Sequence, residues 1–169
     1  MKIKIFVMIS PIIFICIVLY SIASGNKPTK TFPISANIMK LVGSEDKNFS
    51  FDEAKGRVYL VNFFATWCKM CLKEHKYLVS LSKELDVPIY GVVIRDDHQN
   101  IDRLLSNFGN PYELVIEDDG DFSHSIPVKG LPTTILVDQN GQIVTGYSGS
   151  INPDIFKKHF RPMINEIGK

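Results

Sequence analysis

The segment from Arg57 to Phe64, RVYLVNFF, constrains the fold of this chain more than any other part of the sequence. It is rich in β-branched and aromatic residues and follows Gly56, which predicts a buried central strand. A helix is predicted over residues 69–86, because apolar residues recur there at helical spacing while charged residues fill the other positions. The apolar positions of this helix are Leu72, His75, Leu78, Val79, Leu81 and Leu85.

The rest of the domain continues to alternate strands and helices. The predicted elements are a strand over 88–95, a helix over 98–108, a short strand over 113–117, a strand over 133–137, its partner over 142–147 and a helix over 153–164. Asp96 and Asp97 predict the cap of the second helix, and Gly109 predicts its end. Asn140-Gly141 predicts a two-residue hairpin turn, and Pro162 is expected to bend or shorten the last helix. This order predicts an α/β fold with a mixed central sheet and helices on both faces.

The first two dozen residues differ from the rest. Lys2 and Lys4 precede a nearly unbroken apolar run from Ile5 to Ala23, which is just long enough to span a bilayer as a helix. Lysines before the run and a neutral sequence after it predict that the N-terminus stays inside and that the domain lies outside. Residues 1–24 are therefore expected to form an N-terminal transmembrane anchor. A cleaved signal peptide is the alternative, since Ser21-Ile22-Ala23 fits a cleavage site.

Composition predicts a single exported domain. Residues 24–48 are rich in Ser, Gly, Asn, Lys and Pro, and a linker is predicted over residues 25–40. Residues 41–169 are of ordinary size for one domain. The net charge is +1, with acidic and basic residues interspersed, so no basic tract indicates nucleic-acid binding. An aromatic content of 11% argues against disorder of the domain.

The three cysteines indicate reactive chemistry rather than a disulfide framework. Cys16 lies in the apolar N-terminal run, and Cys68 and Cys71 form one C-x-x-C pair, which is too close in sequence to staple distant parts of a fold. Cys68 directly follows the central strand and opens the next helix, where unpaired N–H groups and the helix dipole lower the pKa of a thiol. Cys71 lies in the first helical turn, placed to attack a mixed disulfide formed on Cys68.

A C-x-x-C pair can also bind zinc or attach haem. A zinc site would use Cys68, Cys71 and His75, but the sequence has no second C-x-x-C and no other histidine at ligand spacing. Haem attachment needs a histidine directly after the second cysteine, where this chain has Leu72. No cofactor or metal is therefore expected. The motif alone leaves the direction of electron transfer open.

Residues 60–75, LVNFFATWCKMCLKEH, resemble the active-site segment of thioredoxin-fold proteins, and GLPTTILVD at 130–138 adds to the likeness. With GNPYEL at 109–114, the chain resembles the thiol:disulfide interchange proteins of cytochrome c maturation, the CcmG/DsbE type. The resemblance covers residues ~49–162, and it implies a thioredoxin-like fold with a redox disulfide between Cys68 and Cys71. It implies that Cys68 attacks and that Cys71 resolves.

The resemblance also assigns supporting residues. It implies that Pro132 is cis and that Leu131 lies beside the cysteines, where its backbone can pair with an incoming chain. Trp67 is expected to shield the cysteines and to offer an apolar contact to a partner. Glu74 has two interpretations, the simpler being that it complements the helix dipole. The other is proton handling for Cys71, which the resemblance makes possible. His75 is expected to be a packed core residue.

The sequence departs from the CcmG/DsbE pattern at Lys69, Met70 and Thr133. It departs from cytosolic thioredoxins at Asn62, where the CcmG/DsbE type also tends to lack the aspartate. Asn62 stands where cytosolic thioredoxins carry a buried aspartate, and an amide cannot accept a proton from a buried cysteine. Thr133 follows the proline where an acidic residue is frequent, and Lys69-Met70 replaces a pair that usually contains proline. These changes leave the reduction potential and substrate preference open. Asn110-Pro111-Tyr112 is expected either to line a groove for a client or to form a plain turn.

The sequence thus predicts a membrane-anchored thiol:disulfide oxidoreductase in the bacterial periplasm. The resemblance implies that it reduces the disulfide of apocytochrome c before haem attachment, with electrons from an inner-membrane donor of the DsbD/CcdA type. An exported protein that acts on many clients, as reductase or oxidase, is a second hypothesis. A non-enzymatic module that binds a thiol-containing or haem-handling partner is a third.

Overall fold

The computed structural model describes residues 32–34, 39–42, 47–118, 120–126 and 128–168 of the 169-residue chain. The predicted anchor over residues 1–24, together with Cys16, lies outside this part of the chain. Within the described ranges, no helix is both long enough and apolar enough to cross a membrane.

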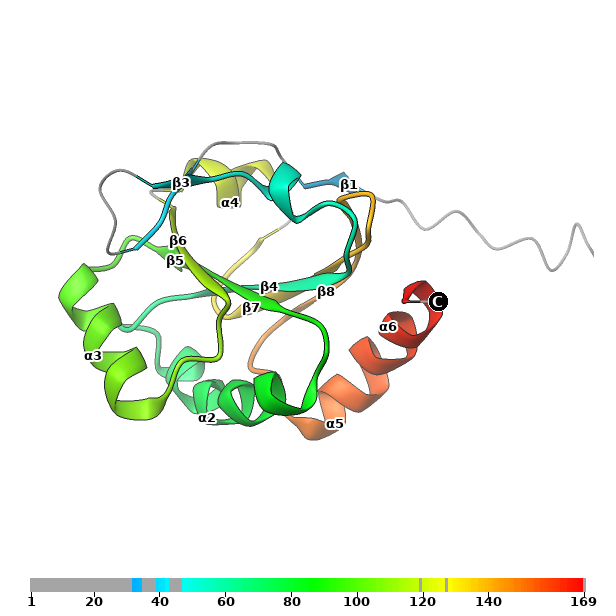
Figure 1. Cartoon of the computed structure of the whole chain (residues 1–169). Coiled ribbons are helices and arrows are strands. Elements are labelled where there is room, and N and C mark those ends of the chain that lie inside the picture. The colour runs from blue at the N-terminus through cyan, green and yellow to red at the C-terminus, as the bar shows by residue number, and fades with distance from the viewer. Residues whose placement is uncertain (1–31, 35–38, 43–46, 119, 127, 169) are drawn as a thin grey trace, which may run out of the picture. The chain divides into compact units, whose positions relative to one another are not determined.

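The central feature of the domain is a six-stranded sheet with strand order β1-β8-β7-β4-β5-β6 (Figure 1). Its strands are β1 (Phe32–Pro33), β4 (Tyr59–Phe64), β5 (Ile89–Ile94), β6 (Leu114–Asp118), β7 (Thr133–Val137) and β8 (Gln142–Ser148). Strand β4 pairs in parallel with β5 and antiparallel with β7, so the predicted mixed sheet with a buried central strand is confirmed. A separate two-stranded ribbon joins β2 (Met39–Lys40) to β3 (Asn48–Phe49).

Helices cover both faces of the sheet, as predicted. They are α2 (Lys69–Glu84), α3 (His98–Phe108), α4 (Asp121–Ser125), α5 (Pro153–Ile155), the π-helical turn η2 (Phe156–Phe160) and α6 (Arg161–Ile167). In Figure 1, α2, α5 and α6 lie below the sheet, while α4 and the 3-10 turn η1 (Phe51–Ala54) lie above it. Asp97 caps α3 by accepting a hydrogen bond from the Gln99 amide, and Gly109 ends the helix.

Alternate residues of β4 serve two different cores. Tyr59, Val61 and Phe63 belong to the core under η1 and α4. Leu60 and Phe64 belong to the core under α2 and the C-terminal helices. Successive side chains of a strand point to opposite faces, so the fully buried Asn62 faces α2. A polar side chain is thereby placed in the apolar layer beneath the helix that begins at Cys68.

Helix α2 buries His75, Leu78 and Leu81 of the predicted apolar stripe, but not Leu72. Its buried positions include Cys71, Glu74, His75 and Leu78, whereas Leu72 is 44% exposed. Leu72 lies about 100° around the helix from Cys71, outside the buried arc that also contains Glu74 and Leu78. The prediction for Leu72 was wrong because it treated Glu74 as a surface residue.

The domain begins earlier than its apolar pattern predicted. Residues 25–40 were expected to be a linker, yet Phe32–Pro33 pairs with β8 as an edge strand. Ile34 and Met39 are buried in the core under η1 and α4. Two-residue strands are too short to show an alternating pattern, and this also explains why β2 and β3 were not predicted.

The C-terminal helix contains a π-helical turn before Pro162. The amide of Arg161 donates to the carbonyl of Phe156, five residues back, instead of to the usual fourth residue. Pro162 lacks an N–H, so the regular hydrogen-bond ladder cannot continue through it. The predicted bend takes this form, and the helix then continues to Ile167 rather than ending near residue 164.

Replacing Gly91 with alanine is expected to destabilise the domain by about 1–3 kcal/mol. A Cβ at this position of β5 would lie 2.9 Å from Phe64 Cε1 and 2.9 Å from Tyr112 Cγ, and those two rings are stacked with centroids 4.8 Å apart. Chemical denaturation of the purified protein measures the change. Gly130→Ala is the control, because its Cβ would meet no atom within 4 Å. Equal stability of the two variants would contradict the close packing at Gly91.

Candidate active site

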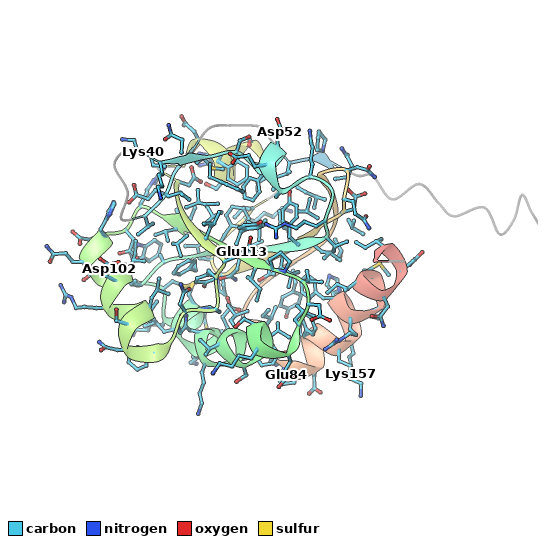
Figure 2. All side chains as sticks on the ribbon, viewed as in Figure 1. Lys40, Asp52, Glu84, Asp102, Glu113 and Lys157 are labelled. Atoms are coloured by element: carbon cyan, nitrogen blue, oxygen red, sulfur yellow. A yellow bond between two sulfur atoms is a disulfide. The ribbon has the colours of Figure 1, made fainter. Side chains whose placement is uncertain are left out.

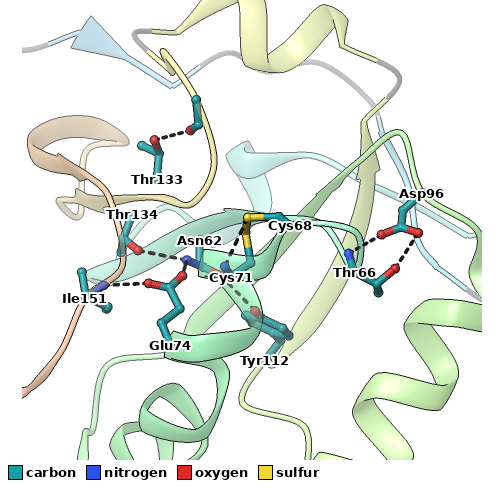
Figure 3. The surroundings of a disulfide bond; sticks show 11 residues. Asn62, Thr66, Cys68, Cys71, Glu74, Asp96, Tyr112, Thr133, Thr134 and Ile151 are labelled. Carbon is teal, nitrogen blue, oxygen red and sulfur yellow. Dashed lines mark hydrogen bonds between the residues drawn. A yellow bond between two sulfur atoms is a disulfide. The ribbon is translucent and has the colours of Figure 1, made fainter.

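Cys68 and Cys71 form a disulfide where β4 gives way to α2 (Figure 3). Cys68 is the N-cap residue of α2, and its Sγ accepts a hydrogen bond from the Cys71 amide at 3.2 Å. The two residues are 8% and 4% exposed, respectively, so Cys68 is the more exposed residue of the pair. When the pair is reduced, the same amide and the positive end of the helix dipole are placed to stabilise a thiolate on Cys68.

The segment before the disulfide is fixed to the end of β5. The Thr66 amide and hydroxyl both donate to the Asp96 carboxylate, the hydroxyl at 2.9 Å. The Trp67 indole N–H donates to the Arg95 carbonyl at 3.1 Å, although the Trp67 residue is 61% exposed. Asp96, predicted as a helix cap, therefore anchors the active-site loop, whereas Asp97 alone caps α3. Trp67 is consequently held on the surface next to Cys68.

A cis-proline loop leads into β7, whose Thr133 pairs with Phe63 of β4. The Leu131–Pro132 peptide bond is cis, and β7 begins at the next residue. Pro132 is buried and its carbonyl accepts from the Gly149 amide at 2.8 Å, while Leu131 is half-buried. Thr133, which occupies the position of a frequent acidic residue, is buried and donates its hydroxyl to the Gly130 carbonyl at 2.7 Å. The loop therefore contributes no carboxylate at this position.

Glu74 is a buried carboxylate beneath the disulfide. It is 1% exposed and lies three residues after Cys71, on the same face of α2. Its Oε1 accepts from the Asn62 side-chain amide at 2.9 Å, and its Oε2 accepts from the Ile151 amide at 2.7 Å (Figure 3). Burial raises the pKa of Glu74 to about 7, although both hydrogen bonds favour the ionised form and oppose that rise. The simpler interpretation, that Glu74 complements the helix dipole, does not account for its burial or for its position beyond the first turn of α2.

Two further residues complete the polar network. Asn62 Oδ1 accepts from the Tyr112 hydroxyl at 2.9 Å, and Asn62 Nδ2 also donates to the Thr134 hydroxyl at 3.0 Å. Tyr112 is only 6% exposed, although with Asn110 and Pro111 it borders a surface hollow of about 420 Å³. It is brought to the site by the loop between α3 and β6, 50 residues from Asn62 along the chain. Sequence analysis singled out Asn62 and Tyr112 separately, and no sequence pattern links them to each other or to Ile151.

His75 packs into the core beside this network. Its Nε2 bonds the Gly109 carbonyl at 2.9 Å, and burial lowers the pKa of its imidazole. The ring is therefore neutral near pH 7 and engaged with backbone. Among the described residues, no group of three His, Cys, Asp or Glu side chains is arranged to hold a metal ion.

The raised pKa of Glu74 makes stability depend on pH. The folded protein binds this proton more tightly than the unfolded chain, so Glu74 favours folding below about pH 4.5, and this contribution is lost as pH rises through about 7. We expect the unfolding free energy of the oxidised protein to fall by about 2–3 kcal/mol more between pH 4 and pH 8 than that of Glu74→Gln. Urea denaturation of both proteins at both pH values measures this difference. His75 titrates in both proteins and cancels, and parallel pH profiles would contradict the raised pKa.

Comparisons with known proteins agree with this site. The family model described as Redoxin matches residues 25–159. A Pasteurella multocida protein, described as a probable thiol:disulfide interchange protein DsbE-2, is 34% identical over 137 residues, covering 80% of this chain and 69% of that protein. The thiol:disulfide interchange protein DsbE of Escherichia coli is 35% identical over 116 residues, covering 68% of this chain and 62% of that protein. The chain thus spans less than two thirds of the Escherichia coli relative.

A solved structure supports the same fold. The thiol:disulfide interchange protein of the thioredoxin family from Chlorobium tepidum superposes with a TM-score of 0.65 at 23% sequence identity, covering 82% of this chain and 97% of that one. A thioredoxin-like sheet with a C-x-x-C disulfide at the mouth of α2, faced by a cis-proline, defines a thiol:disulfide oxidoreductase. Within that class, the chain belongs to the Redoxin family and is a thiol:disulfide interchange protein of the DsbE type.

Proposed function

We propose that this protein is a membrane-tethered reductase of the bacterial periplasm, and that its client is the disulfide of an apocytochrome c. The observation that carries the proposal is the pairing of a nucleophile-ready Cys68 at the N-terminus of α2 with a buried carboxylate, Glu74, behind Cys71. Membership of the DsbE type supports the reducing direction and the client, both of which are part of the proposal.

The proposed cycle begins with the reduced pair. The Cys68 thiolate attacks one sulfur of the client disulfide, forming a mixed disulfide and releasing the other client sulfur as a thiolate that takes up a proton. Cys71 then loses its proton to the Glu74 carboxylate and attacks Cys68 as a thiolate. The Cys68–Cys71 disulfide forms, and the second client thiol leaves. Two electrons have passed from the protein to the client, and a donor dithiol of the DsbD/CcdA type returns them.

Exposed apolar side chains around Cys68 are suited to contact the client. The large hydrophobic residues that are exposed in the described ranges are Trp67, Met70, Leu72 and Phe108. The first three lie within four residues of Cys68 in sequence, and a hollow of about 440 Å³ that includes Phe108 opens beside Trp67. Contiguous exposed apolar surface commonly marks a protein-binding site. In the proposed complex, the Leu131 backbone pairs with the client on the opposite side of the disulfide.

The membrane tether and the periplasmic location rest on the sequence of residues 1–24. The lysines before the apolar run favour an N-terminus inside and a domain outside. An oxidising compartment would keep the pair as a disulfide, so a reductase there needs an electron supply through the membrane. An inner-membrane donor of the DsbD/CcdA type is proposed for this reason.

A deletion strain tests the proposed client. We expect the strain to lose most of its holocytochrome c and to recover it with the wild-type gene, but not with a Cys68→Ser, Cys71→Ser variant. Stained c-type haem in membrane fractions gives the readout. Normal cytochrome assembly in the deletion strain would exclude this client. Full rescue by the double variant would exclude redox chemistry and favour a binding module.

A further inference from the structure

Tyr112 and Asn62 belong to the polar network under α2, and the thiol–disulfide exchange steps themselves assign neither residue a role. We propose that Tyr112 orients the side-chain amide of Asn62, and that the oriented amide holds Glu74 as the ionised acceptor of the Cys71 proton. Both are positioning residues, because neither touches the reacting sulfurs. The inference rests on the proposed proton transfer from Cys71 to Glu74 and goes beyond it by naming what prepares the carboxylate.

Every hydrogen bond to Glu74 is suited to a carboxylate. Its two oxygens accept from the Asn62 amide at 2.9 Å and from the Ile151 backbone amide at 2.7 Å. A backbone N–H can only donate, so Oε2 must remain an acceptor. Protonation of Oε1 would weaken it as the acceptor of the Asn62 N–H. The network therefore favours loss of the proton after Glu74 has accepted it, which allows the carboxylate to act again.

The orientation of Asn62 follows from Tyr112. The amide is fully buried, its oxygen accepts from the Tyr112 hydroxyl at 2.9 Å, and its nitrogen donates to Glu74 and Thr134. Turning the amide over would set its oxygen against the Glu74 carboxylate and leave the phenolic proton of Tyr112 without an acceptor in the described structure. Thr134 does not select between the two orientations, because a hydroxyl can donate or accept.

Tyr112 is itself held rigidly. Asn110 Oδ1 accepts from the Tyr112 amide at 2.9 Å and fixes the turn, and the ring stacks on Phe64 with centroids 4.8 Å apart. Gly91 leaves room for both rings. Burial, and then the negative charge of Glu74, raise the pKa of Tyr112 well above its ordinary value. The hydroxyl therefore remains a phenol and a donor throughout the pH range in which Glu74 titrates.

The surroundings of Glu74 contain few competing charges. Its own helix contributes Cys71 and His75, whose imidazole is neutral near pH 7, and the loop before β6 contributes the neutral phenol of Tyr112. The pKa of Glu74 is set by burial and by the hydrogen bonds from Ile151 and Asn62. A change in the Asn62 hydrogen bond should therefore appear directly in the titration of Glu74.

The test is an NMR titration of oxidised, full-length protein in detergent micelles, with glutamate labelled at the carboxyl carbon. Glu74→Gln assigns the Glu74 resonance by its disappearance. In Tyr112→Phe we expect the Glu74 inflection to move up from about 7 by about one pH unit, because the freed amide no longer stabilises the carboxylate. Two matched variants should leave it in place. Thr134→Val removes a hydroxyl from the same amide, and Tyr77→Phe removes a phenol from α2 that is absent from the network.

The titration results show whether Tyr112 sets the pKa of Glu74 through Asn62. An unmoved inflection in Tyr112→Phe overturns it, and so does an equal shift in Thr134→Val, which would indicate general loosening. If Tyr112→Phe does not fold, the Asn62 side-chain amide resonances of the wild type must still titrate together with Glu74, and their failure to move also overturns it. The proposed function fails separately. In that case Glu74 titrates as expected, but Glu74→Gln resolves mixed disulfides at the wild-type rate.

Discussion

Cys71→Ala is expected to stop turnover and to leave the protein covalently joined to its client through Cys68. Cys68 remains the N-cap of α2 and can still attack a client disulfide, but no thiol is left in the first helical turn to release the product. Removing one member of a catalytic pair commonly costs on the order of 10³-fold or more in rate. Reduction of an oxidised C-x-x-C-H peptide by the purified full-length protein measures this loss.

Mixed disulfides that Cys71→Ala forms in cells show which clients the protein reacts with. Non-reducing electrophoresis of Cys71→Ala should show a dominant mixed disulfide with an apocytochrome c, and a Cys68→Ser, Cys71→Ala protein should show none. A broad ladder of adducts would instead favour an exported oxidoreductase with many clients. Cys16→Ser is the matched control and should keep full activity. Wild-type turnover by Cys71→Ala would contradict the assignment of the resolving thiol.

Glu74→Gln is expected to slow release of the mixed disulfide by about 10²-fold at pH 7, which is the usual scale of general base catalysis. In the wild type, the release rate should rise as pH passes through about 7, because Glu74 then becomes ionised and can accept the Cys71 proton. In the variant this inflection should vanish, leaving only the rise that accompanies titration of the thiol itself, near pH 8.5 for an ordinary cysteine.

Single-turnover quenching with a preformed mixed disulfide isolates this step. Glu84→Gln is the matched control, since Glu84 is an exposed carboxylate at the other end of α2 (Figure 2). It should keep both the rate and the inflection of the wild type. A pH profile of Glu74→Gln that retains the inflection near 7 would assign it to another group and remove Glu74 from the proton transfer.

The fold could be predicted because its central elements carry strong periodic patterns. The run at residues 57–64 and the helical spacing after Cys68 correspond to β4 and α2. Asn140-Gly141 correctly predicted the β7–β8 hairpin, but the connection spans residues 138–141 rather than two residues. Elements without a periodic pattern were missed, including β1, whose two residues are held by pairing with β8, and the five-residue α4. Short segments of this kind are stabilised mainly by tertiary contacts, which cannot be predicted from the local sequence pattern.

Some residues of the site could likewise be predicted from local sequence, and others could not. Cys68 and Cys71 could be singled out because their chemistry depends on local position at a helix N-terminus. Glu74 was predicted to lie near them, but its hydrogen bonds come from distant parts of the chain. Asn62, which Tyr112 holds in turn, is one partner, and Ile151, 77 residues away in sequence, is the other. A carboxylate in the first turns of a helix resembles an ordinary dipole partner in sequence, and only the packed sheet beneath α2 shows that it is buried.

The redox state of Cys68 and Cys71 in growing cells shows whether this protein acts as a reductase. Cells expressing a Cys16→Ser protein are quenched in acid, their free thiols are alkylated with a mass tag, and the tags are counted by electrophoresis. The proposed reductase should be mainly reduced and carry two tags, and it should become oxidised when the membrane donor is deleted. A protein that carries no tags in cells with an intact donor would contradict its assignment as a reductant.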